Sequence, residues 1–262
     1  MRPFFYGFSF QIEVLYLCIV EIPVLIILII FIASTVFATF GFGDALLALP
    51  FLTIILGVKT ATPLLAMSGL TLALCLLGSG FKNIVWKEAF KLILGSLVGV
   101  PLGVLALRYG DERIMRMIVG SVIIFISLYN LFKPNLSPIP TDRYAPVFGM
   151  MGGVLGGAFN VSGPPVVLYG AMRAWTPMVF TGMMQAFFVP TDIFVIIGHL
   201  QSGLLNENVL HLYLWCLPFL LLAVFIGTQI KKRISVASFQ KWVFILILFS
   251  GIMLVVKSVL SA

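Results

Sequence analysis

The chain has 262 residues, of which 61% are hydrophobic and only 10% are charged, and its mean hydropathy is +1.17. Soluble domains carry about 25% charged residues, and disordered segments combine low hydrophobicity with high charge. The composition therefore excludes both an ordinary cytosolic enzyme and a disordered protein. The length leaves room for roughly eight to ten membrane segments of about 20 residues. The net charge of +7 comes from basic residues in short groups between apolar runs, as in membrane-protein loops, which argues against a nucleic-acid partner.

The first 132 residues predict a surface segment followed by a first set of spans. Residues 1–21 predict an amphipathic lead-in rather than a cleaved signal peptide, because polar residues interrupt the apolar run and no small-residue cleavage site follows. The uncharged run 22–40 is long enough to cross a membrane. The break Gly41-Phe42-Gly43-Asp44 and a short apolar piece come next. Three further spans end near residues 81, 108 and 132.

A polar, turn-rich linker at 133–145 separates these spans from a second set at 146–262. The second set opens with the uncharged stretch 146–172, which contains Asn160-Val161-Ser162-Gly163-Pro164-Pro165. Further spans are predicted at 176–198, 208–230 and 236–256.

An internal repeat organises the two sets. A shift of 119 residues places 33–44 on 152–163, so that small residues match small residues and Phe40 meets Phe159. The predicted fold class is an all-α polytopic membrane protein with two sequence-related halves, 22–132 and 146–262. Each half has about four spans and one discontinuous Gly/Pro-broken segment near its start. Such breaks must lie inside the protein, and a matched pair of them indicates a binding site at the membrane midplane of a transporter.

The paired breaks resemble those of the sulfite exporter TauE/SafE family. The resemblance rests on Gly41-Phe42-Gly43-Asp44, which a proline follows at position 50, and on Ser162-Gly163-Pro164-Pro165. It extends from about residue 22 over nearly the whole chain. It implies a transporter of sulfite, organosulfonates or related small acids in the cytoplasmic membrane. Two positions depart from the family pattern: Asp44 replaces a glycine of the first motif, and Asn160 stands where the second often has glycine.

Asp44 is the most informative residue, because an acid at the membrane centre costs about 2.5–3.5 kcal/mol on insertion scales. Burial favours the protonated form of a carboxyl, and a bound anion favours it further, so that proton and anion would load together. Asp44 is therefore a candidate for proton coupling. The alternative interpretation is a capping residue for the short helix that follows Gly43. The two roles are compatible.

The breaks also supply candidate substrate contacts. A helix that starts in mid-membrane presents free N–H groups and a partial positive charge, which suits an oxyanion; Gly41, Gly43, Ser162 and Gly163 are placed there. Asn160 can bond a substrate oxygen or satisfy the broken backbone. Pro164 and Pro165 either define the start of the second short helix or produce a kink. The glycine pairs at 152–153 and 156–157 are interpreted as close helix packing.

Four residues outside the breaks complete the candidate site. Asp192 is either a second coupling acid or a polar helix-end residue near His199, and Gln185 lies two helical turns earlier on the same face. Lys59 and Arg173 either draw anions into a vestibule or extend from the membrane interface towards water.

The sequence contains no motif for metal binding, hydrolysis or ATP-driven transport. Cys18, Cys75 and Cys216 stand far apart in apolar runs, and His199 and His211 have no supporting ligand cluster, so neither a metal nor another cofactor is expected. The sequence has no Walker loop and no hydrolase elbow, so we expect no enzyme and no ATP-driven pump.

The sequence therefore predicts a multi-pass protein of the cytoplasmic membrane, a secondary transporter that exports small oxyanions with proton coupling. Its partners are a small anionic solute and the lipid bilayer. A passive channel for anions or weak acids is the alternative function. The basic residues do not settle the orientation, and the repeats are parallel with four passes per half or inverted with five. Small residues facing lipid permit a homodimer.

Overall fold

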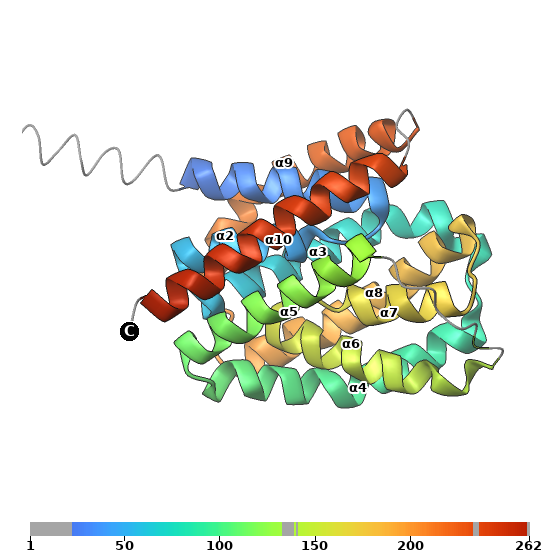
Figure 1. The fold of residues 1–262 in the computed structure, drawn as a ribbon, viewed down its shortest axis with the longest axis horizontal. Coiled ribbons are helices and arrows are strands. Elements are labelled where there is room, and N and C mark those ends of the chain that lie inside the picture. The colour runs from blue at the N-terminus through green and yellow to red at the C-terminus, as the bar shows by residue number, and fades with distance from the viewer. Residues whose placement is uncertain (1–22, 133–138, 140, 233–235, 261–262) are drawn as a thin grey trace, which may run out of the picture.

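A computed structural model describes residues 23–132, 139, 141–232 and 236–260, and this part of the chain contains helices and no strand (Figure 1). A first helix, Pro23–Phe40, precedes eleven helical segments of the described chain. Their bounds are α2 Asp44–Leu56, α3 Val58–Gly80, η1 Phe81–Asn83, α4 Trp86–Tyr109, α5 Glu112–Phe132, η2 Asp142–Tyr144, α6 Ala145–Phe159, α7 Gly163–Met172, α8 Pro177–Gln201, α9 Glu207–Lys231 and α10 Val236–Leu260. The predicted lead-in lies outside the described residues.

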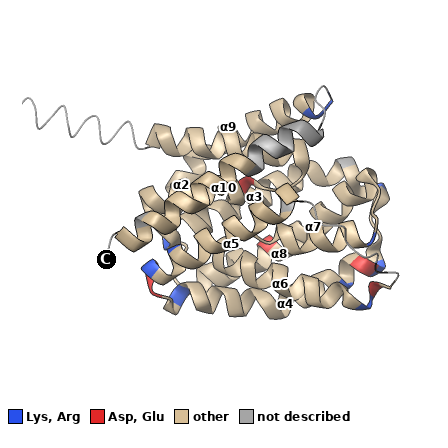
Figure 2. Ribbon diagram, in the orientation of Figure 1, with Lys and Arg blue, Asp and Glu red and all other residues tan. Residues whose placement is uncertain are grey.

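The long helices form a multi-pass membrane bundle. Five helices of the described chain are long and apolar enough to cross a membrane: Pro23–Phe40, Val58–Gly78, Trp86–Tyr109, Pro177–Gln201 and Glu207–Lys231. Figure 2 shows charged residues gathered at the two ends of the bundle and an almost uncharged band between them. Large apolar side chains such as Phe125 and Trp215 stand about 70% exposed on its outside. An exposed apolar band of this kind suits lipid and not water.

Glycines allow α4 and α6 to pack backbone against backbone. Gly95, Gly99 and Gly103 of α4 face α6, and Gly149, Gly153 and Gly157 of α6 face α4. The pairing runs in the same direction along both helices, since Leu92 meets Gly149 and Val100 meets Gly157. A Cβ at position 153 would lie 2.6 Å from the Ser96 carbonyl oxygen, closer than real contacts allow. The packing interpretation is thus confirmed for Gly153 and Gly157.

Helices α3 and α8 cross in opposite directions through the centre of the bundle. Gly80 contacts Gly182 near one end of the pair, and Gly69 faces Asp192 further along. A hydrogen bond of 3.1 Å between the hydroxyls of Ser96 and Thr191 joins α8 to α4. These contacts bring Asp192 to the centre of the bundle, where it is 4% exposed.

The second break reverses the chain. Helix α6 ends at Phe159, and α7 begins at Gly163 and runs back along it, so that the rings of Phe148 and Tyr169 lie 5.4 Å apart. Helices α6 and α7 thus differ from the single discontinuous pass that we expected, because the chain enters and leaves them at the same end of the bundle. The physical reason is the left-handed residue Asn160 (φ 56°), which turns the backbone out of the helix.

Candidate functional site

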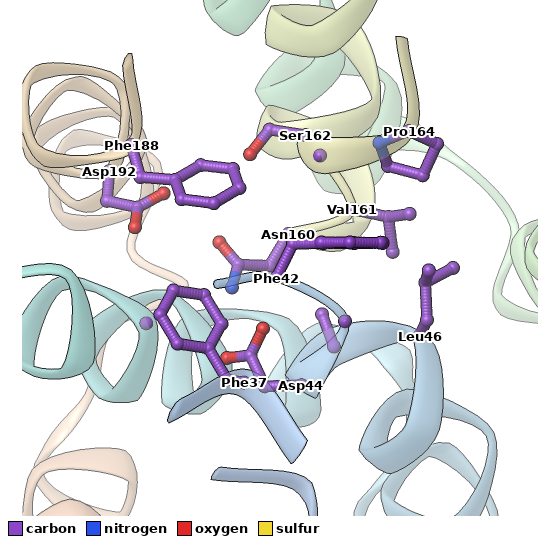
Figure 3. Close-up of a pocket in the computed structure, with 14 residues that line it drawn as sticks. Phe37, Phe42, Asp44, Leu46, Asn160, Val161, Ser162, Pro164, Phe188 and Asp192 are labelled. Carbon is purple, nitrogen blue, oxygen red and sulfur yellow. The ribbon is translucent and has the colours of Figure 1, made fainter. Parts of the chain in front are cut away.

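The two breaks meet in one buried cavity at the centre of the bundle (Figure 3). Residues on both sides of each break line it, together with one residue of α3 and two of α8: Phe37, Phe42, Gly43, Asp44, Ala45, Leu46, Gly69, Asn160, Val161, Ser162, Gly163, Pro164, Phe188 and Asp192. Its water-accessible volume is about 20 Å³, which is room for about one water molecule. A solute larger than water therefore needs a wider cavity than this conformation offers.

Two acids face each other across this cavity. Asp44 is 6% exposed and Asp192 is 4% exposed, and Figure 3 shows the carboxamide of Asn160 between their carboxyl groups. Asp44 lies at the start of α2, and its Oδ2 has no partner among the described residues. Within the described lining the two aspartates are the only ionisable side chains. A buried polar atom without a protein partner is a position where water, an ion or a solute can bind.

Gly69 is the residue around which these polar groups gather, and the sequence analysis missed it. A Cβ atom at position 69 would lie 3.3 Å from both Asn160 Nδ2 and Asp192 Oδ2, and 3.7 Å from Asp44 Oδ2. The sequence around it is an apolar run with a few small residues, a pattern that ordinary helix packing also produces. Its role therefore becomes visible only when α3 is placed between the two breaks.

We predict that Gly69→Ala lowers transport about tenfold or more while the protein stays folded. Alanine is more favourable than glycine inside a helix by about 1 kcal/mol, but its methyl group would press on Asn160 and Asp192. Transport by reconstituted protein and thermal unfolding in detergent measure the two effects. Gly78→Ala on the same helix is the matched control, since a Cβ there meets nothing within 4 Å. Equal activity of the two variants would contradict the prediction.

Asn160 serves both the backbone and the cavity. It ends α6 in the left-handed region, with φ 56° and ψ 24°, and its backbone N–H bonds to Gly156 and Leu155 oxygens. Asparagine adopts this conformation more readily than other residues with a side chain, which explains why asparagine can stand where the resembling family often has glycine. Its side-chain Oδ1 has no partner among the described residues and is buried at the cavity.

Two variants distinguish the backbone role of Asn160 from the role of its side chain at the cavity. Asn160→Gly keeps the backbone free to adopt the positive φ and should retain thermal stability, but it removes the carboxamide and should weaken solute binding several-fold. Asn160→Ala should lose the same binding and in addition about 1–2 kcal/mol of stability, the cost of a left-handed residue with a Cβ. Unfolding temperature and transport KM measure the two losses. Equal stability of the two variants would contradict the backbone role.

Two helices begin at the cavity. Gly43 (φ 103°) is the N-cap of α2, and Ser162 is the N-cap of α7 with no side-chain capping bond. Pro164 and Pro165 occupy the first turn of α7, where they fit and donate no N–H. The N–H groups of Ser162 and Gly163 thus have no partner within α7. A helix start of this kind suits an anion.

Other predicted site residues lie outside the cavity lining. Gln185 is fully buried and donates a hydrogen bond of 3.2 Å from Nε2 to the Gly41 carbonyl oxygen. Lys59 donates to the Arg108 carbonyl oxygen at one end of the bundle. Arg173 forms an ion pair of 2.6 Å with Glu88, which Tyr169 and Trp175 also contact. His199 bonds to the Gly157 carbonyl oxygen.

Comparison with known proteins identifies the family of the chain. The sequence profile of the family "Sulfite exporter TauE/SafE" matches residues 26–254. A protein of Cupriavidus necator described as "Probable sulfite/organosulfonate exporter TauE" is 24% identical over 234 residues, which cover 87% of this chain and 91% of that protein. No solved structure matches the chain. The family comprises membrane transporters and not enzymes, and the matched residues include both breaks and the whole cavity. The chain therefore belongs to the sulfite exporter TauE/SafE family of membrane transporters.

Proposed function

We propose that this protein exports small oxyanions such as sulfite and organosulfonates across the cytoplasmic membrane, with a proton loaded beside each anion. The observation that carries the proposal is the pair Asp44 and Asp192 in a cavity whose described lining has no basic side chain. A protonated carboxyl donates a hydrogen bond to an oxyanion, whereas an ionised one repels it. Anion binding beside these acids would therefore require proton uptake.

The proposed solute site combines these acids with the start of α7. The N–H groups of Ser162 and Gly163, the Ser162 hydroxyl and the Asn160 carboxamide can all bond to oxyanion oxygens. A site without a fixed positive charge can hold the anion weakly enough to release it on the other side. The printed name of the Cupriavidus necator relative supports sulfite and organosulfonates as the class of solute.

We further infer that the two halves are inverted repeats and that alternating access occurs between them. If each break turns back as the second one does, each half has five helices, and an odd number reverses the second half in the membrane. The packing of the first helix against α9 supports this, because Gly227 contacts Thr35 and Ala38 much as Gly103 contacts Val154 and Gly157. Transporters with such repeats bind solute at the midplane and rock one part against the other.

Proton coupling also sets the direction of flux in this proposal. If proton and anion move together, the net flux follows the sum of their gradients. Because an outside-acid pH gradient opposes outward movement of the pair, a high concentration of the anion inside the cell must drive export. The inside-negative potential adds to that force when the bound anion carries more charge than the protons loaded with it.

The test is uptake by proteoliposomes of purified protein, with sulfite, an alkylsulfonate and a carboxylate as separate solutes. The membrane potential is clamped at zero, and the outside is either at the internal pH or one unit more acidic. We expect accumulation of sulfite and the sulfonate above the external concentration only under the acid gradient. Flux that only dissipates the solute gradient at either pH would show a passive channel. Absence of flux for all solutes would refute the transport proposal.

A further inference from the structure

A second cavity lies at the end of the bundle where α9 ends. Its water-accessible volume is about 430 Å³, far larger than that of the central cavity. Polar residues of three elements contribute to its wall: Asn83 of η1, Thr181 of α8, and Thr228, Lys231 and Lys232 around the end of α9. We call this cavity the vestibule.

The vestibule has the positively charged side chains that the central cavity lacks. Two lysines line it, and no acid is among the described lining residues. Cations in a hollow with apolar walls concentrate small anions from solution and speed their binding. The sequence analysis assigned such a role to Lys59 and Arg173, but Arg173 is paired with Glu88, and neither residue lines this vestibule.

One short segment separates the vestibule from the central cavity. Gly41 lines the vestibule, and the next two residues, Phe42 and Gly43, line the central cavity. Both glycines have positive φ angles, 86° and 103°, so the segment can change its backbone angles at low cost. Gln185 attaches this segment to α8 through its hydrogen bond to Gly41. A shift of these three residues would join the two cavities.

The same end of the bundle carries most of the basic side chains that the structure describes. Described basic residues at this end are Lys82, Lys87, Lys91, Arg143, Arg173, Lys231 and Lys232, and those at the opposite end are Lys59, Arg108, Arg113 and Arg116 (Figure 2). An excess of Lys and Arg in short loops marks the cytoplasmic side. This assigns the vestibule to the cytoplasm, which is where an exporter must collect its solute.

We propose that the vestibule is the cytoplasmic capture site for small oxyanions, in which Lys231 and Lys232 bind the anion before segment 41–43 admits it to the central cavity. The inference rests on the proposed function for the identity of the solute. It adds a binding site, the residues that form it and the side of the membrane to which it opens.

The charge of the vestibule is tested with the double variant Lys231→Gln/Lys232→Gln. We expect the KM for an alkylsulfonate to rise about tenfold at low salt with kcat little changed, and the difference to shrink near 1 M salt, where the screening length is about 3 Å. Lys82→Gln is the matched control, because it removes an exposed charge at the same end but does not line the vestibule. An unchanged KM and salt dependence in the double variant, with active wild-type protein, would overturn the capture role.

The side of the membrane to which the vestibule opens is tested by cysteine labelling, which needs no transport measurement. Thr181→Cys is introduced into a variant whose native cysteines are replaced by alanine, and a membrane-impermeant thiol reagent is added from one side at a time. We expect labelling from the cytoplasmic side only, and slower labelling when an alkylsulfonate is present at low salt. Labelling from the other side would overturn the orientation, and labelling that the sulfonate does not slow would overturn the binding site. If wild-type protein failed to transport, the proposed function would fail while this labelling still decided the vestibule.

Discussion

Asp44→Asn is expected to abolish accumulation driven by a pH gradient. One pH unit corresponds to about 1.4 kcal/mol per proton and sustains about tenfold accumulation of a monoanion that moves with one proton. Asparagine has nearly the same shape but cannot bind or release the proton, so accumulation should fall to the external concentration. The expected reason is local: Asp44 lies at the start of α2, and its Oδ2 faces the cavity without a partner among the described residues.

The measurement is uptake of an alkylsulfonate at zero membrane potential with the outside one pH unit more acidic. Thermal unfolding should show that the variant stays folded, since a neutral amide replaces a buried acid. Glu207→Gln is the control, because it removes an exposed carboxyl at the start of α9, far along the chain from either break. Undiminished accumulation by Asp44→Asn would place the coupling proton elsewhere, and Asp192→Asn would then be the next variant.

The largest effect on stability is expected from the glycines between α4 and α6. A Cβ at Gly149 would overlap the Leu92 carbonyl group, and one at Gly95 would overlap the Pro146 carbonyl group. Both neighbours are backbone atoms in helices, so neither can move as the end of a side chain would. Gly149→Ala must therefore push the two helices apart. We expect a loss of about 3 kcal/mol, at the upper end of the usual cost of overpacking, and a greater loss for Gly149→Val.

The loss of stability is measured by thermal unfolding in detergent. The readout is the fraction of protein that stays monodisperse as the temperature rises. Gly78→Ala is again the matched control, because the same change meets open space there and alanine favours the helix. Gly95→Ala on the facing helix should behave like Gly149→Ala. A Gly149→Ala protein as stable as the control would mean that α4 and α6 do not pack as closely as these contacts require.

The parts of the fold that could be predicted from the sequence are those in which the local residue pattern is distinctive. The breaks at 41–43 and 160–162 could be located because glycine, proline and polar residues interrupt long apolar runs, and hydrocarbon tolerates no exposed irregular backbone. The grouping of Asp44, Asn160, Ser162 and Gly163 followed from the match between the two halves, and the structure places all four in one cavity.

Neighbouring glycines on α6 show that the sequence pattern cannot distinguish a glycine in helix packing from a glycine beside the cavity. Gly153 and Gly157 pack against α4, whereas Gly152 and Gly156 face the backbone and side chain of Ser162 beside the cavity. All four occur in one small-residue pattern in the chain. A helix turns about 100° per residue, so adjacent glycines point to different neighbours, and the identity of those neighbours depends on the other helices.

Composition and periodicity were sufficient to predict a helical membrane protein, because hydrocarbon imposes apolar helices on each segment separately. Whether a break continues a pass or turns back depends on backbone angles at a few residues, such as Asn160, which the hydrophobic pattern does not report. The roles proposed for Gly69, Lys231 and Lys232 depend on contacts between helices far apart in the chain. These residues carry no local signal, because a small residue inside a helix and a lysine at its end are common wherever helices pack or leave the membrane.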